Sequence, residues 1–305
     1  GGLRYEYIQT QALGSYRQIN YHPLTNEVLF DTTYNENKSN SRSIFLAGLG
    51  VTYKVSKNSS VYSNNSQNYR GINFSDIRIS NPNQKVDENI QDEKGFNTDL
   101  GFKKRTDNFQ LDVSGFFLYY NNKIGVVNQK DSLNEFFRLR TNIGNAYSTG
   151  LELYAEYQFK NSDSASFKTT VFVNGSYVHA RYGKSLESAY SNKQIELVPP
   201  ITLKSGIKFQ LFNWNASLLA TYVQKHFTDG TNAEFDPNAV AGIIPSYYVL
   251  DFSTRYKINK NCEIKTEINN LTNNKYITRR ASAYPGPIII PSDEINFYLT
   301  LGITL

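Results

Sequence analysis

The last residues of the chain show its dominant pattern, an alternation of apolar and polar positions. In Ile295–Leu305 (INFYLTLGITL), every second residue from Ile295 onward is apolar, and the residues between are polar, small or tyrosine. Successive side chains of a strand point to opposite sides, so this segment predicts a strand with one apolar face. A strand of a soluble sandwich would show the same pattern, and one segment therefore does not separate the two folds.

The alternation recurs along the chain and predicts about twelve strands. Their expected ranges are Leu3–Gln9, Ile44–Val55, Ser60–Arg70, Phe96–Lys103, Phe109–Tyr119, Tyr147–Phe159, Phe167–Tyr177, Ile201–Gln210, Trp214–Tyr222, Leu250–Ile258, Cys262–Ile268 and Ile295–Leu305. The third strand is the least regular, because its positions are mostly polar on both faces. Short turns and long polar loops alternate as connections. Antiparallel neighbours joined in this way place every long loop at one end of the sheet and every turn at the other.

This arrangement is typical of outer-membrane barrels, which have short periplasmic turns, long outer loops, an apolar outer face and a polar lumen. Pairs such as Glu152 with Glu156, and Lys204 with Lys208, lie on the polar face and favour a wet interior over a dry sandwich core. Lipid cannot satisfy an open sheet edge, so the sheet is expected to close on itself. The predicted fold class is all-β, an antiparallel transmembrane β-barrel.

Composition is consistent with this class. The 305 residues are 39% hydrophobic, and no run approaches the roughly 20 apolar residues of a membrane-spanning helix. Tyrosine and phenylalanine are abundant, at 23 and 19 against a single tryptophan, which suits a membrane–water boundary. The net charge of +5 comes from scattered basic residues, so no nucleic-acid partner is expected. The lone Cys262 excludes an intrachain disulfide. With no Met and no signal peptide, the chain is interpreted as a mature or truncated piece of something longer.

Two motifs resemble signatures of TonB-dependent outer-membrane receptors. Asn269–Tyr276 (NNLTNNKY) resembles the NLfDkkY motif that precedes the last strand in that family. Ile143–Glu152 (IGNAYSTGLE) resembles the N-x-G-x-A-x-x-x-G-h-E signature that starts a mid-barrel strand. Further segments are similar to the ferric dicitrate receptor branch, namely Tyr276–Arg280, Tyr284–Pro287, Pro291–Asp293, Tyr62–Asp76 and Asp92–Gly95.

The resemblance implies a 22-stranded barrel whose lumen is filled by an N-terminal plug. Residues 1–305 would then form a single incomplete domain, the C-terminal part of the barrel with about twelve strands, without the first half or the plug. It also implies energy-coupled import of a ferric chelate, with ferric citrate as the expected ligand, driven by the TonB complex through the missing N-terminal part. Expected surroundings are the bacterial outer membrane, its lipid and lipopolysaccharide, and the barrel-assembly machinery during biogenesis.

Two other functions stay open. One is a passive, self-contained twelve-stranded channel, and the other is a truncated barrel that acts as a non-transport surface protein or an assembly substrate. An enzyme is not expected, because no Gly-rich phosphate loop follows a strand and no Ser/His/Asp set has an informative spacing. His22, His179 and His226 lie far apart and are interpreted as solvated residues rather than a metal site. No cofactor is expected, since iron would arrive as a chelate.

A ferric citrate complex is anionic and already coordinates its iron, so the protein must offer donors for carboxylates, for which arginine is suited. The candidates are Arg70, Arg78, Arg138, Arg140, Arg279 and Arg280, with Gln129 as a neutral donor. For any single arginine, a solvated rim charge or a lipopolysaccharide contact is the more common role. Arg138 and Arg140 share one face if their segment is extended, which makes this pair the more specific candidate for binding the ligand.

Overall fold

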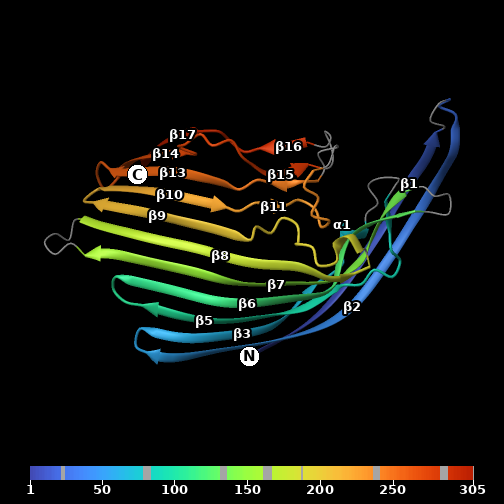
Figure 1. Ribbon diagram of the computed structural model, residues 1–305, viewed down its shortest axis with the longest axis horizontal. Helices are drawn as coiled ribbons and strands as arrows, with labels where there is room; N and C mark the ends of the chain where they lie inside the picture. Colours follow the sequence, from blue (N-terminus) through green and yellow to red (C-terminus); the bar gives the residue numbers. More distant parts are fainter. Residues whose placement is uncertain are drawn as a thin grey trace.

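The computed structural model describes residues 1–21, 25–77, 84–130, 136–160, 167–186, 188–235, 241–281 and 288–304. Within these ranges, twelve strands of one thirteen-stranded sheet pair antiparallel in an order that follows the chain, as predicted. Figure 1 shows them side by side, with β1 and β2 reaching beyond the others at one end. The strands are β1 (Gly2–Tyr21), β2 (Val28–Ser56), β3 (Ser59–Arg70), β5 (Glu93–Arg105), β6 (Phe109–Lys130), β7 (Phe136–Lys160), β8 (Phe167–Ser185), β9 (Ile201–Leu211), β10 (Trp214–Val223), β13 (Tyr247–Lys257), β14 (Cys262–Asn269) and β17 (Asn296–Ile303).

Five strands are much longer than the alternation predicts. β1 and β2 pair from Gly2 opposite Gly48 to Tyr21 opposite Val28, across a segment that we expected to be a loop. β6, β7 and β8 also continue past their predicted ends. The correction has a physical reason. Above the membrane a strand pair has no lipid to face, so its Ser, Thr and Asn residues need not alternate with apolar ones, and the pattern that marks a membrane strand disappears.

The sheet is open in the part of the chain that the structure describes. β1 and β17 stand at the two ends of the strand order, and no pairing joins them. These twelve strands do not close on themselves, and the fold is a partial barrel, as the family resemblance in the sequence implied. Among the described residues, no helix is long and apolar enough to cross a membrane.

The apolar faces of the strands point away from the interior. Leu49, Leu299 and Leu301 are 58%, 68% and 61% exposed, so these faces do not pack against each other in a core. The buried apolar residues form small clusters instead, one of which consists of Val127, Ile143, Ala146 and Tyr182. Folding thus leaves the outer surface apolar, as transmembrane barrel strands require.

Outward-facing rings form two rows at the edges of this apolar surface. The turn-end row lies near the short turns and consists of Phe109, Tyr157, Trp214 and Tyr256. The loop-end row lies near the long loops and consists of Phe96, Tyr119, Tyr147, Tyr222 and Tyr248. On β7 the rows are ten residues apart, about 33 Å along the strand, or about 25 Å along the axis of a barrel with strands tilted by about 40°. That separation matches the apolar band of a membrane barrel.

The segment Asn269–Tyr276 closes the loop end of β14. Asn270 adopts a positive φ of 52° and is 2% exposed. Its side chain accepts a bond from the Asn274 backbone N–H (2.8 Å) and donates to the backbone oxygens of Asn274 (2.9 Å) and Asp293 (3.2 Å). Its own N–H donates to Asp251 on β13 (2.9 Å). Asparagine tolerates this φ and supplies both a donor and an acceptor, which explains its place in the motif.

The segment Ile143–Glu152 surrounds an irregularity in β7. The register with β8 shifts between Gly144 and Ala146, and Gly144 has φ 139°. A Cβ at Gly144 would lie 2.4 Å from the backbone oxygen of Lys184, so only glycine fits. Ile143 and Ala146, at 3% and 0% exposure, both enter the buried cluster with Tyr182. The motif therefore marks a bulge whose two sides both pack inward.

Candidate functional site

The candidate site lies at the loop end of β7, where the described parts of the segment between β3 and β5, residues 71–77 and 84–92, fold back against the sheet. This segment contains a one-turn helix, α1 (Phe74–Ile77), and a short strand, β4 (Gln84–Val86). β4 pairs in parallel with β7, with Gln84 opposite Arg138 and Val86 opposite Arg140. The pairing of β8 with β7 begins only at Gly144, so the edge of β7 beyond it is available to β4. Open backbone groups on a strand edge favour this kind of addition.

A network of four charged residues, which we call the Asp76 cluster, ties α1 to three strands. Asp76 is fully buried and accepts bonds from Arg70 of β3 (2.9 and 3.0 Å) and from Arg140 of β7 (2.5 and 3.1 Å). Arg70 also donates to Glu93 of β5 (3.0 Å), whose carboxylate accepts the backbone N–H of Ile124 (2.9 Å). The cluster joins residues up to 64 positions apart in the chain.

The cluster is balanced in charge, with two guanidinium groups against two carboxylates. Burial raises the pKa of Asp76, but the backbone N–H of Asn73 and the guanidinium groups of Arg140 and Arg70 outweigh it, so the pKa is lowered from 3.8. Asp76 therefore stays ionised at neutral pH. Ile72, Ile77 and Ile124 pack into a small apolar cluster next to it. Such surroundings exclude water and strengthen the ion pairs.

The predicted arginines fall into different settings. Arg70 and Arg140 contact carboxylates in the Asp76 cluster. Arg138 is exposed, two residues along β7, and Gln129 of the adjacent β6 is exposed opposite Phe137. The structure thus brings Arg70, Arg138, Arg140 and Gln129 to one region. Arg78 lies outside the described residues.

Arg279 and Arg280 lie on a separate hairpin, formed by β15 (Ile277–Ala281) and β16 (Ile288–Pro291). Arg279 is exposed and lines a cavity of about 580 Å³, together with Asp251, Asp293 and Tyr298. Arg280 donates to the backbone oxygen of Ile243 (3.3 Å), at the short β12 (Ile243–Ile244), which pairs with β11 (His226–Phe227). These two arginines are not part of the Asp76 cluster.

Sequence reasoning missed the partners of these arginines. Lys85 of β4, opposite Leu139, lies with its Nζ 4.2 Å from the centre of the Phe137 ring, on the other face of β7 from Arg138. Asp76 and Glu93 fall in segments that carried the family resemblance, but nothing in their spacing showed that they would meet Arg70 and Arg140. The only signal was acidic residues inside a loop otherwise rich in candidate cations.

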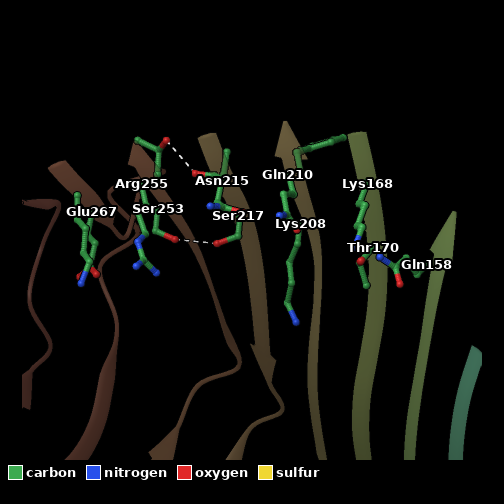
Figure 2. Close-up of a pocket in the computed structure, with 14 residues that line it drawn as sticks. Gln158, Lys168, Thr170, Lys208, Gln210, Asn215, Ser217, Ser253, Arg255 and Glu267 are labelled. Atoms are coloured by element: carbon green, nitrogen blue, oxygen red, sulfur yellow. Dashed lines mark hydrogen bonds between the residues drawn. The ribbon is translucent and has the colours of Figure 1, made fainter. Parts of the chain in front are cut away.

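A second polar region covers the inner wall near the short turns, which we call the turn-end cavity. It has a volume of about 440 Å³ and draws residues from β7, β8, β9, β10, β13 and β14 (Figure 2). Its ion pairs join Lys208 to Glu156 (3.5 Å) and Arg255 to Glu263 (2.6 Å). Ser217 and Ser253 share a hydrogen bond of 2.7 Å. These are the polar positions of the predicted alternation, on the face opposite the apolar surface.

Across the described part of the chain, no three His, Cys, Asp or Glu side chains gather into a metal site. His22 lies outside the described residues. His226 has its Nδ1 3.0 Å from the backbone oxygen of Gln224, and His179 accepts a bond from Arg181 (3.1 Å).

An open antiparallel sheet with an apolar outer face, two aromatic rows and a polar inner wall defines part of a transmembrane β-barrel. Residues 1–271 match the family described as TonB dependent receptor-like, beta-barrel, and the chain belongs to that family. No curated protein sequence matches the chain.

Solved structures with the same fold share little sequence with this chain. The ferric citrate transporter FecA in its unliganded form has a TM-score of 0.75 at 15% identity, over 99% of this chain and 42% of that one. The ferric yersiniabactin uptake receptor FyuA from Yersinia pestis has a TM-score of 0.72 at 17% identity, over 99% of this chain and 42% of that one. The copper transporter OprC has a TM-score of 0.69 at 15% identity, over 99% of this chain and 44% of that one. The chain thus spans less than half the length of these proteins.

Proposed function

We propose that the complete protein is a receptor of the bacterial outer membrane that imports an anionic ferric chelate, with ferric citrate as the first ligand to test. Membership of the receptor-barrel family supports transport as the general role. The similar structures are named for ferric citrate, ferric yersiniabactin and copper, so metal uptake is common to these three while the cargo differs. The choice of an anionic chelate comes from the residues of this chain.

The observation that carries the proposal is the cationic group beside the Asp76 cluster. Arg138 and Lys85 lie on paired strands, with the exposed Gln129 on the next strand. Because Asp76 and Glu93 already neutralise Arg70 and Arg140, the charge available to a ligand comes from Arg138 and Lys85. Arg138 lies on the same face of β7 as Arg140, whereas Lys85 and Gln129 lie on the face of Phe137 and Leu139. A ligand that presents several carboxylates would therefore meet Arg138 on one face, or Lys85 with Gln129 on the other. Direct ligand contact by Arg70 and Arg140 stays a prediction, as does contact by Arg279 and Arg280.

Energy would come from the TonB complex, acting through the N-terminal part of the receptor. Outer-membrane lipid and lipopolysaccharide would surround the apolar face, and the barrel-assembly machinery would insert the chain. A passive twelve-stranded channel would require β1 to pair with β17, and the strand order counts against it. A truncated barrel with a non-transport surface role is the remaining alternative, and chelate uptake by the complete protein separates it from the receptor.

The test is binding of ferric citrate to the full-length receptor and to its Arg138→Ala and Lys85→Ala variants. Loss of one charge-assisted hydrogen bond is expected to raise Kd about 10-fold for Arg138→Ala if the ligand binds on the face of Arg140, or for Lys85→Ala if it binds on the other face. Arg255→Gln in the turn-end cavity is the matched control and should leave Kd unchanged. Wild-type receptor that binds ferric citrate with Kd unaltered by either loop-end substitution would contradict this site. Ferric siderophores and oligosaccharides, tested alongside, distinguish other cargo.

A further inference from the structure

A further charged feature, outside the sites above, lies on the outer wall at the loop end of β8. Ala180 and Tyr182 are buried, at 6% and 2% exposure, and Tyr182 packs in the inner cluster. Strand side chains alternate, so His179, which precedes Ala180, and Arg181, which lies between Ala180 and Tyr182, face outward. Arg181 is paired with Tyr147 across to β7, which places it in the loop-end aromatic row.

Arg181 is unusual for this surface. Between the two aromatic rows, the outward positions of β7, β9, β10 and β13 carry no charged side chain, and those of β8 carry none before His179. A charge within the apolar band of a barrel is costly, but the cost falls near the membrane interface. An arginine in the aromatic row therefore sits at the depth of lipid headgroups.

The guanidinium group is held in a fixed orientation. Its Nε donates to His179 Nε2 (3.1 Å), and Nη1 donates to the backbone oxygen of Asn192 (2.5 Å). The His179 ring lies 6.3 Å from the Tyr147 ring. Pre-orientation lowers the entropy that an arginine loses when it binds a phosphate.

The chain returns beside β8 and places Gln194 opposite Arg181. The Tyr182 N–H donates to the Lys193 oxygen (2.9 Å), so Lys193 lies opposite Tyr182 and on the inner face. Lys184, three residues beyond Arg181 in β8, is exposed. Among the described residues, no carboxylate forms an ion pair with Arg181, Lys184 or Lys193.

We propose that Arg181, held by His179 and the backbone oxygen of Asn192, binds the phosphate of a glycolipid in the outer leaflet of the membrane. The position in the aromatic row selects a lipid-borne phosphate, and a guanidinium group without an ion-paired carboxylate among the described residues selects an anion. The inference rests on the proposed outer-membrane location, and it is independent of the cargo.

The experiment is native mass spectrometry of the detergent-purified full-length receptor with diphosphoryl lipid A and with the same lipid after removal of both phosphates. The proposal expects retention of diphosphoryl lipid A at least about 10-fold above the dephosphorylated lipid, a loss of about 10-fold in Arg181→Gln, and a smaller loss in Arg181→Lys. The control is Lys104→Gln, an exposed lysine near the short turn after β5, which should bind as wild type does.

Equal retention of the two lipids, or wild-type retention by Arg181→Gln, would overturn the proposal. Inorganic phosphate is added as a competitor, and displacement of lipid A at equal concentration would show a free-anion site instead of a lipid site. Ferric citrate binding is measured on the same samples. If ferric citrate binding is unchanged in Arg181→Gln while lipid retention falls, the lipid site and the import site are separate. The lipid proposal and the import proposal can then be rejected independently of each other.

Discussion

The Asp76 cluster and the turn-end cavity both contain oppositely charged residues of one sheet, yet they differ in their contact with water. Asp76 and Glu93 are 0% and 3% exposed, whereas the carboxylates paired with Lys208 and Arg255 at the cavity are 20% and 23% exposed. The difference arises because residues 71–77 and 84–92 cover the loop end of the sheet, and no described segment covers the turn end. The same kinds of ion pair therefore hold a loop in place at one end and form a wet wall at the other.

This contrast separates structural charge from available charge. A buried carboxylate that loses its partners, or an arginine pair that loses its carboxylate, leaves an uncompensated charge, which costs several kcal/mol. A solvated pair is screened by water and contributes little. Counting cations in the sequence treats Arg140 and Arg138 alike, although only Arg138 is exposed.

The largest expected effect is that of Asp76→Ala. It leaves the guanidinium groups of Arg70 and Arg140 facing each other without their shared carboxylate, at a cost of about 3–5 kcal/mol in local stability. Hydrogen exchange of backbone amides in residues 71–92 should speed up by several orders of magnitude, while β9 and β10 keep their protection. Equal protection of residues 71–92 in the variant would show that the loop is held by other contacts.

The next effect in size is that of Asn270→Ala, which removes three side-chain hydrogen bonds and the preference for positive φ, at about 2–3 kcal/mol. Asn270→Gly keeps the φ but loses the same bonds, so it should recover part of the loss. Thr272→Ala, at an exposed position in the same motif, is the control. Thermal unfolding in detergent gives the Tm of all three variants. A Tm of Asn270→Ala equal to that of the wild type would show that Asn270 does not stabilise the fold.

A pH titration tests the charge of Asp76 without a substitution in the cluster. Because its pKa is lowered in the folded protein, its stabilising effect is present above the ordinary value of 3.8 and is lost as pH falls through the lowered folded value. A spin label at the exposed Asn89, in a Cys262→Ser background, should therefore report an ordered loop from pH 8 down to about pH 5 and a mobile one only in stronger acid. If the spin label already became mobile at pH 6, a titrating group other than Asp76 would be the one that keeps the loop ordered.

The smallest effect is expected in the turn-end cavity. Glu156→Gln removes the 3.5 Å pair with Lys208, and because Lys208 is solvated the cost should be at most about 0.5 kcal/mol. Denaturant unfolding in lipid vesicles gives the free energy of unfolding. A loss above about 2 kcal/mol would mean that the pair is desolvated and that the contrast between the two ends is wrong.

Much of the fold followed from the sequence because its cause is local. A strand between lipid and water must alternate, so the order of the twelve strands, their outward faces and the polar positions near Lys208 and Arg255 were readable residue by residue. The two motifs were equally local, since Asn270 and Gly144 are each required by the conformation of their own segment. For the candidate site, the sequence supplied Arg138 and Gln129 as residue types but not their neighbours.

Only the tertiary structure decided which charges are available. Arg70 and Arg140 meet Asp76 from positions 6 and 64 residues away, and Lys85 reaches the Phe137 ring through a parallel pairing that exists because β8 leaves the edge of β7 open. It also decided that β1 and β2 extend far past the membrane and that β1 and β17 end the sheet unpaired with each other. The sequence determined which way each membrane strand faces, because lipid and water act on every residue separately. Contacts between loops and strands depend on where distant segments meet, and no local pattern records that.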